Sequence, residues 1–166
     1  GRRRAHWLET CRQLVNSDAK EFLSTVPPIN GTLRDYQREG VAWLNKLKDC
    51  DFHGVLADEM GLGKTVQALA AILQHKRTGS TGNPSLVVCP TSLIENWKFE
   101  AARFAPELSV IAIHGNERGK AFEELRECDL GITSYALLRR DQPVYRDFTF
   151  DYLILDEAQH IKNPNT

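Results

Sequence analysis

The sequence lacks most features that would place it outside the ordinary globular proteins. It has only four cysteines in 166 residues, with no CxxC pair and no cysteine–histidine cluster spaced for zinc. No apolar run approaches the roughly 20 residues of a membrane span, and the first residues lack the apolar core of a signal peptide. We therefore expect reduced thiols in a cytoplasmic protein (the bacterial nucleoid included) or a nuclear one, neither membrane-bound nor secreted.

The sequence also has no large excess of positive or negative charge. Lysine and arginine number 21 against 22 acidic residues, so no strongly basic field points to nucleic acid, although a local groove can be basic on a neutral domain. With 42% hydrophobic residues, the chain can bury one ordinary core. Its function has to be inferred from motifs.

The most informative motif is GVLADEMGLGKT at residues 54–65. An apolar run, a glycine-interrupted turn and an alanine-rich stretch of helix formers predict a strand, a loop and a helix. Backbone N–H groups at the start of that helix favour an anion, and glycines let the loop approach phosphate closely. Lys64 is suited to the β- and γ-phosphates and the Thr65 hydroxyl to Mg²⁺. Asp58 stands where the general GxxxxGK[ST] pattern has its first glycine.

A second motif, YLILDE at residues 152–157, is an apolar run that ends in two acids. It predicts a buried parallel strand with carboxylates at its carboxyl end, the edge at which open α/β sheets bind ligands. We expect Asp156 to share that edge with Lys64 and to hold Mg²⁺, and Glu157 to orient and deprotonate the attacking water. Together the two motifs favour a nucleoside-triphosphatase.

Alternating strands and helices predict the fold: a RecA-like α/β three-layer sandwich with a mostly parallel sheet. We expect a helical extension and a proline-rich joint in residues 1–30 and an ATPase lobe in residues 31–166. Two capping boxes are predicted, Thr32 with Asp35 and Ser92 with Glu95. The expected strands are 54–58, 85–89, 109–113, 130–133 and 152–156, and the expected helices are one starting near Thr32, then 64–76, 93–104, 118–127 and 135–140.

Four segments together closely resemble the Swi/Snf-type branch of the superfamily 2 helicase-like ATPases. They are TLRDYQREGVAWL (32–44), ADEMGLGKT (57–65), VCPTSLIENWK (88–98) and LDEAQHIKNP (155–164), and the resemblance covers roughly residues 30–166. In that branch an aspartate normally stands at the position of Asp58. The acidic motif reads DEAQ and not DEAH, which leaves the role of Gln159 open.

The resemblance implies roles for further residues. Gln37 would recognise the adenine edge, the alternative being a solvent-facing glutamine. Two segments would contact a nucleic-acid backbone, the alternative for both being helix capping; they are Pro90, Thr91 and Ser92, and Thr133 and Ser134. Trp97 is expected to be a core anchor of its helix and not a platform for base stacking. The candidate ATP site comprises Gln37, Asp58, Glu59, Met60, Gly61, Leu62, Gly63, Lys64 and Thr65.

The leading hypothesis is the first RecA-like lobe of a DNA-stimulated ATPase that uses ATP and Mg²⁺ and moves along double-stranded DNA, with a DNA-bound protein complex as a further partner. The alternatives are a DEAD-box-like RNA helicase lobe and a nucleotide- or DNA-binding scaffold that has lost hydrolysis. A second RecA-like lobe is expected to close over the nucleotide and supply arginine fingers, which elsewhere contribute about 10³–10⁵ in rate. We expect residues 1–166 alone to hydrolyse ATP negligibly.

Overall fold

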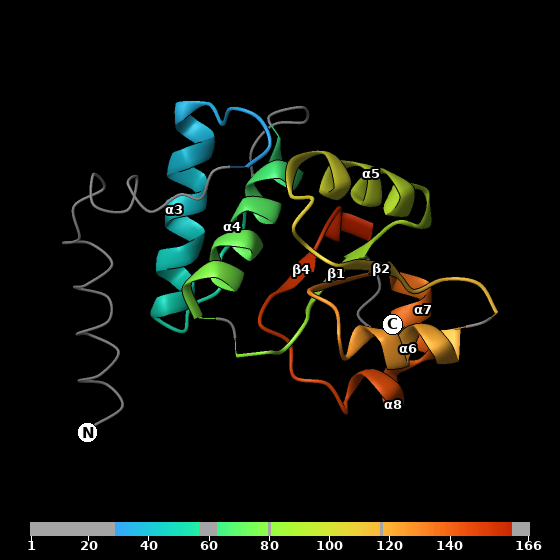
Figure 1. The fold of residues 1–166 in the computed structure, drawn as a ribbon. Helices are drawn as coiled ribbons and strands as arrows, with labels where there is room; N and C mark the ends of the chain where they lie inside the picture. Colours follow the sequence, from blue (N-terminus) through green and yellow to red (C-terminus); the bar gives the residue numbers. More distant parts are fainter. Residues whose placement is uncertain (1–28, 57–62, 80, 117, 161–166) are drawn as a thin grey trace, which may run out of the picture. The chain divides into compact units, whose positions relative to one another are not determined.

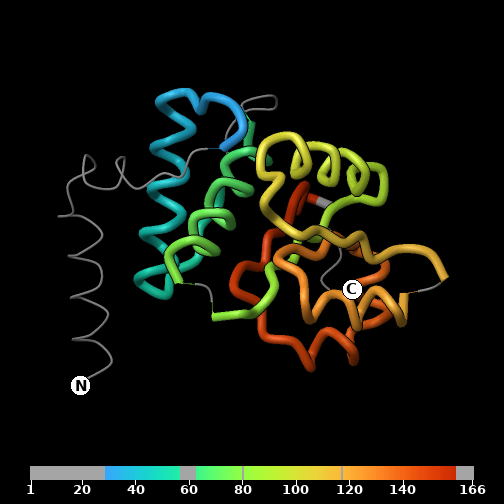
Figure 2. The backbone as a smooth tube through the Cα atoms, viewed as in Figure 1, coloured from blue at the N-terminus to red at the C-terminus, as the bar shows by residue number. Residues whose placement is uncertain are grey.

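The structure is a computed structural model that describes residues 29–56, 63–79, 81–116 and 118–160 (Figures 1 and 2). The chain divides into two compact units, residues 1–75 and 76–166, and each is described by itself. Residues 1–28, which hold most of the expected helical extension and joint, lie outside the described residues, as do residues 57–62 of the phosphate loop. Within the described ranges, no helix combines the length and the apolar character that a membrane crossing requires.

The first unit contains α3 (Asp35–Asp49) and the greater part of α4 (Lys64–Gly79), which lie side by side (Figure 1). The Asn45 side-chain amide donates to Gln74 Oε1 at 2.6 Å. Gly40 allows the close approach, because a Cβ at this position would overlap the side-chain oxygen of Gln67. Residues 66–74 of α4 are all buried, as is typical of a helix enclosed by other elements.

Two expectations for this unit are wrong. The cap of α3 does not use Thr32 and Asp35; the helix starts at Asp35, and the Arg34 N–H donates to Gln37 Oε1 at 2.9 Å. Gln37 is the third helical residue, from which a glutamine reaches the backbone N–H before the helix. The strand expected over 54–58 is not formed at residues 54–56, where Val55 is 82% exposed and no described strand pairs with it.

The second unit is built on a parallel sheet with the strand order β2-β3-β1-β4. The order places β1 between two neighbours, and every residue of β1 is buried. This continuous burial explains its apolar sequence, Ser-Leu-Val-Val-Cys. All four strands fall where the sequence predicts them; they are β1 (Ser85–Cys89), β2 (Val110–Ala112), β3 (Leu130–Ser134) and β4 (Leu153–Leu155).

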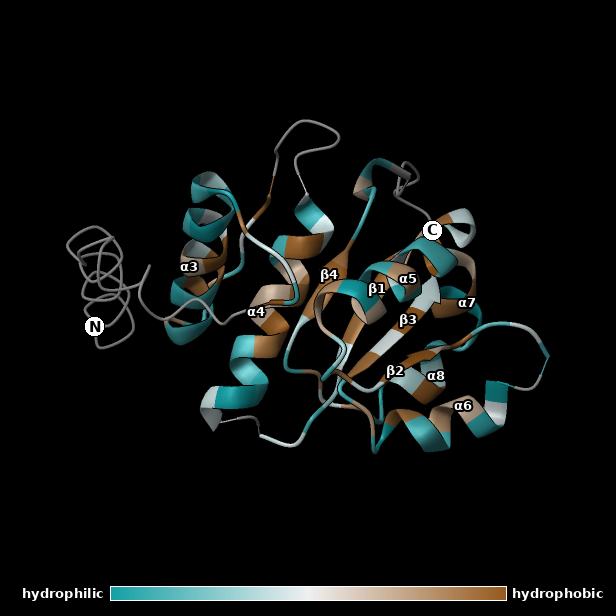
Figure 3. Ribbon diagram, turned by 45° about the horizontal axis from the view of Figure 1, so that its top comes forward, coloured by the Kyte–Doolittle hydropathy of each residue, from teal (hydrophilic) through white to brown (hydrophobic). Residues whose placement is uncertain are grey.

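Helices cover both faces of this sheet (Figure 1). Leu86 and Val88 point to one face, where a hydrophobic cluster includes Leu125 of α6 and Tyr145 of α8. In Figure 3 β4 is coloured hydrophobic, whereas α6 alternates between hydrophilic and hydrophobic bands. The helices of this unit are the 3₁₀ turn η1 (Thr91–Leu93), α5 (Ile94–Phe104), α6 (Arg118–Leu125), α7 (Tyr135–Arg140), α8 (Gln142–Tyr145) and the 3₁₀ turn η2 (Ala158–His160).

The sequence did not predict α8, a four-residue helix with a proline in its first turn. The expected Ser92–Glu95 capping box is also wrong. Residues 91–93 form a 3₁₀ turn, so that α5 begins at Ile94 after Leu93, and no side chain caps it.

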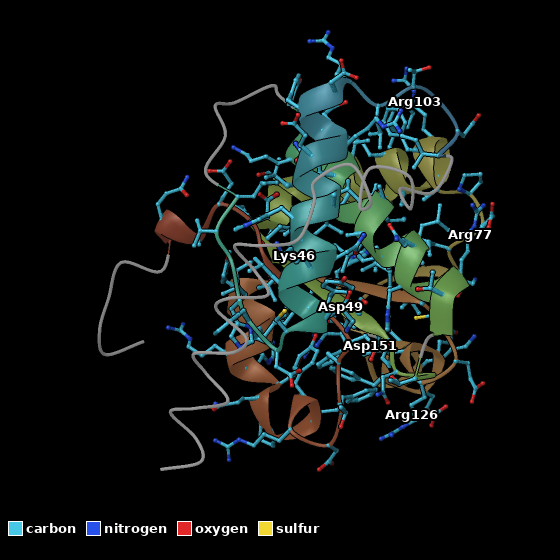
Figure 4. The ribbon with its side chains drawn as sticks, turned by 90° about the vertical axis from the view of Figure 1, so that its left-hand side faces the viewer. Lys46, Asp49, Arg77, Arg103, Arg126 and Asp151 are labelled. Atoms are coloured by element: carbon cyan, nitrogen blue, oxygen red, sulfur yellow. The ribbon has the colours of Figure 1, made fainter. Side chains whose placement is uncertain are left out.

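A polar network fixes the last turn of α4 to the loops that precede β2 and β3. Asp129 Oδ2 accepts hydrogen bonds from Lys76 Nζ at 2.7 Å, from the Ser109 N–H at 2.7 Å and from Ser109 Oγ at 2.8 Å. Burial by itself raises the pKa of Asp129, but the bonds from Lys76 and Ser109 outweigh it and lower the pKa below its ordinary value. Beside this network, Arg77, labelled in Figure 4, forms an ion pair with Glu107.

We expect Asp129→Asn to lower the free energy of unfolding by about 1–3 kcal/mol, because a charge-assisted acceptor shared by three donors is lost. Because the pKa of Asp129 is lower in the folded state, its ionised carboxylate stabilises the fold at pH values above the unfolded-state pKa. This contribution is lost as the pH falls through the folded-state pKa. The wild type should therefore lose more stability than the variant on acidification below about pH 4. Urea unfolding at several pH values measures both effects, with the exposed Glu127→Gln as control. Parallel pH profiles for the wild type and Asp129→Asn would contradict this account.

Candidate nucleotide-binding site

The start of α4 lies in the first unit, and Lys64 and Thr65 occupy its first turn. The chain enters this turn through Gly63, whose φ of 75° lies in the left-handed region that favours glycine. The Gly63 carbonyl accepts the Gln67 N–H at 3.1 Å, which is the first hydrogen bond of the helix. The candidate residues Asp58, Glu59, Met60, Gly61 and Leu62 lie outside the described residues.

Gln37 lies against this turn. A Cβ added at Gly63 would overlap the side-chain nitrogen of Gln37, so the amide reaches the end of the phosphate loop. The Gln37 side-chain oxygen accepts the Arg34 N–H, which fixes the orientation of the amide. Gln37 is therefore joined to the loop by contact and held by the cap of α3; its contact with adenine stays a prediction.

The second unit contains the carboxyl ends of three neighbouring parallel strands. Cys89 of β1 pairs with Ser134 of β3, and Val88 pairs with Leu155 of β4. Pro90, the end of β3 and Asp156 therefore lie along one edge of the sheet, as the sequence predicts. The predicted position of Lys64 at this same edge stays a prediction, because Lys64 belongs to the other unit.

Asp156 is held by three hydrogen bonds from three different elements. Its N–H donates to the Val88 carbonyl at 2.8 Å, its carbonyl accepts from Tyr135 Oη at 2.7 Å, and its Oδ2 accepts from Trp97 Nε1 at 2.9 Å. Burial, then the nearby charge of Asp156, raises the pKa of Tyr135 to about 12, so the phenol keeps the proton that it donates.

Glu157 follows in an uncommon backbone conformation. Its φ is 53°, in the left-handed region that a non-glycine residue seldom adopts and that is found at functional sites. The Gln159 side-chain amide donates to the Glu157 carboxylate. This contact gives Gln159 a role that the sequence left open: it touches the predicted catalytic base.

The segments expected to contact nucleic acid differ in exposure. Thr91 and Ser92 are exposed beside the sheet edge, so their side chains are accessible. Thr133 and Ser134, in contrast, are 0% and 3% exposed. The Thr133 hydroxyl donates to the Ile113 carbonyl, and Ser134 Oγ accepts the Leu137 N–H as the cap of α7. The capping alternative is confirmed for Ser134, and contact of either residue with nucleic acid stays a prediction.

Comparison with known proteins extends beyond these residues. A family model described as the SNF2-related domain matches residues 36–166. This chain belongs to the SNF2-related family. The fold agrees: the SWI2/SNF2 ATPase core of Sulfolobus solfataricus, solved in complex with dsDNA, superposes with a TM-score of 0.78 and 39% identity over 85% of this chain and 29% of that chain.

Two relatives in eukaryotes show the same similarity. Helicase SWR1 of Eremothecium gossypii is 40% identical over 144 residues, and the ISWI chromatin-remodeling complex ATPase CHR17 of Arabidopsis thaliana is 39% identical over 159 residues. The alignments cover 83% and 92% of this SNF2-related chain but only 10% and 15% of those relatives. The RecA-like fold and the Swi/Snf-type resemblance predicted from the sequence are confirmed.

Sequence reasoning missed the contacts of Trp97 and Tyr135 with Asp156. The core role expected for Trp97 is confirmed by its 2% exposure. One signal was available, because a buried indole N–H requires an acceptor and so demands a polar group next to the core. Which acceptor it meets depends on the sheet register, which the sequence does not specify.

A matched pair of glycines tests the contact between Gln37 and the loop. Gly63 and Gly82 have similar φ values, 75° and 83°, but a Cβ would overlap Gln37 only at Gly63, whereas at Gly82 it meets nothing within 4 Å. We expect either alanine to cost about 1–2 kcal/mol of backbone strain, and Gly63→Ala to cost roughly 1–3 kcal/mol more from overpacking. Urea unfolding of both variants measures the difference. Removing the amide with Gln37→Ala should recover part of the excess, and equal losses for the two glycines would refute the contact.

Proposed function

We propose that this chain is the ATP-binding lobe of a DNA-stimulated ATPase that hydrolyses ATP to ADP and phosphate and moves along double-stranded DNA in the full-length protein. The observation that carries the proposal is the position of Asp156 and Glu157 directly after β4, beside the central strand and in the family order of motifs. Lys64 and Thr65 at the start of α4 supply the phosphate-binding half.

ATP use follows from the ATP-dependent family, and we propose Mg²⁺ as its metal ion. Among the described residues no three histidine, cysteine or acidic side chains gather as a metal cluster. The donor chemistry still fits Mg²⁺, which is usually held by one or two carboxylates, phosphate oxygens and water. Asp156 and the Thr65 hydroxyl would hold it. When bound, the ion would neutralise the negative charge that develops on the phosphates during hydrolysis.

Residues of this chain would bind the phosphates, activate the attacking water and select the adenine ring. Lys64 would neutralise the phosphates, and the start of α4 would bind them through backbone N–H groups. Glu157 would orient the attacking water and accept its proton, with its carboxylate positioned by Gln159. Gln37 would select the adenine ring through its fixed amide.

Double-stranded DNA is the proposed track. The solved relative from Sulfolobus solfataricus binds dsDNA, and Thr91 and Ser92 are exposed at the edge that carries Asp156. Hydroxyl and backbone groups contact phosphates without reading sequence, as a translocating protein requires. A DNA-bound protein complex would be the partner on which the ATPase acts, in keeping with the relative that is named a chromatin-remodeling complex ATPase. The protein would act in the nucleus or at the bacterial nucleoid.

The chain would form one part of a larger, multi-lobe ATPase. We propose that residues 31–166 contribute the first RecA-like lobe, that residues 1–30 are an accessory extension, and that a second lobe supplies the arginine fingers. This division is supported by the family match over residues 36–166 and by the small fraction of each relative that the chain covers.

Glu157→Gln in the full-length protein tests the assignment of the base. It should retain nucleotide binding, because the charge removed is not a phosphate ligand, and should lower the turnover number by about 10²–10⁴-fold. Lys64→Ala should instead lose nucleotide binding. ATPase assays and fluorescent-nucleotide titrations measure the two effects, with Glu127→Gln, an exposed acid on another loop, as control.

The same assay separates the alternatives. Stimulation by duplex DNA supports the translocase, whereas stimulation by single-stranded RNA alone would indicate an RNA helicase. Turnover that is absent from the wild type and unchanged in Glu157→Gln would indicate a scaffold without hydrolysis.

A further inference from the structure

The indole of Trp97 is buried against the predicted metal-binding acid. The side chain is 2% exposed, and Nε1 donates to Asp156 Oδ2 at 2.9 Å. An indole offers a single N–H and no acceptor, so its ring plane and its helix fix the direction of this bond. A bond from a rigid, buried ring restricts the carboxylate more than one from a flexible surface side chain would.

The three hydrogen bonds of Asp156 involve different parts of the residue. Val88 and Tyr135 bond its backbone N–H and carbonyl, and so fix the main chain at the end of β4. Trp97 bonds its carboxylate. Among the described residues, Trp97 is the only hydrogen-bond partner of the Asp156 carboxylate, and this bond is made to Oδ2 and not to Oδ1.

The helix that carries Trp97 connects this contact to another part of the site. α5 begins at Ile94, directly after the 3₁₀ turn Thr91–Leu93, and Trp97 lies in its first turn. Thr91 and Ser92 are exposed, whereas Ile94 and Trp97 are buried. The orientation of the acid is thus set from the helix that continues the predicted nucleic-acid-binding segment.

We propose that Trp97 is a positioning residue for the metal ion: its N–H fixes one oxygen of Asp156 so that the other faces the ion of a bound nucleotide. The proposal deepens the proposed function and rests on it, since it requires Asp156 to hold that ion. Partners that orient a metal ligand from behind commonly contribute 10–100-fold to metal affinity. A purely structural indole would contribute to the core without affecting the metal ion.

The test is Trp97→Phe in the full-length protein, which removes the N–H and keeps an aromatic ring. Binding of a fluorescent ADP analogue is titrated with Mg²⁺, and its affinity is also measured in EDTA. We expect the Mg²⁺ concentration for half-maximal effect to rise about tenfold or more, while affinity for the metal-free nucleotide stays at the wild-type value. Trp43→Phe, a replacement on α3 at a position 40% exposed, should match the wild type in both measurements.

The outcomes distinguish the two proposals. No Mg²⁺-dependent nucleotide binding by the wild type would overturn the proposed ATP site itself. Mg²⁺-dependent binding that is the same in the wild type and Trp97→Phe would leave that site intact and overturn the role of Trp97. A lower melting temperature with unchanged Mg²⁺ dependence would also overturn it, because that is the signature of a structural role alone.

A second measurement applies if Trp97→Phe does not fold. The variant Trp7→Phe/Trp43→Phe leaves Trp97 as the only tryptophan of residues 1–166, so that its fluorescence reports on its own surroundings in this chain. Adding Mg²⁺ to the nucleotide-bound protein should change the emission of Trp97, because its hydrogen-bond acceptor then binds a cation. Unchanged emission at saturating Mg²⁺ would overturn the proposal.

Discussion

The pairing of β1 with a parallel strand on each side is the constraint on which the second unit depends. It buries β1 completely, between β3 and β4, and it brings the carboxyl ends of all three strands to one edge. Parallel neighbours need crossover connections, and these connections supply the helices that cover both faces. The Val88 carbonyl extends the pairing by one bond beyond β4, where it holds the N–H of Asp156.

Along this edge, some residues have proposed chemical roles and others stabilise the fold around them. Asp156 and Glu157 follow β4 and are proposed to hold the metal ion and activate water, while Thr91 and Ser92 are accessible beyond β1. The end of β3 is different. The hydroxyls of its last two residues form hydrogen bonds within the fold, where they stabilise the end of β3 and the start of α7.

Much of this organisation was predictable from the sequence, because apolar runs of about five residues between helical segments define buried parallel strands. All four strands of the second unit and the core position of Trp97 followed from these patterns. The helix starts were less predictable. The caps expected at Thr32 and at Ser92 failed because the helices start at other residues. The helix α3 starts at Asp35, with the Arg34 N–H bonded to Gln37, and α5 starts at Ile94 after a 3₁₀ turn and has no side-chain cap.

The contacts that orient the site were beyond prediction from one sequence. The bonds of Trp97, Tyr135 and Gln159 to the acidic motif depend on strand register, on the angle of a helix and on a left-handed φ at Glu157. None of these leaves a periodic signal in the chain. These contacts nevertheless fix the orientation of the two adjacent acids, Asp156 and Glu157.

Asp156, oriented by Trp97, is proposed to receive the metal ion of the bound nucleotide. Nuclear magnetic resonance of ¹⁵N-tryptophan-labelled protein tests this proposal directly, with paramagnetic Mn²⁺ in place of Mg²⁺. We expect the Trp97 indole N–H resonance to broaden when Mn²⁺ and ADP are both bound and to stay sharp with Mg²⁺ and ADP. A Trp97 resonance that remains sharp with Mn²⁺ and ADP bound would contradict the account, because the ion would then lie far from Asp156.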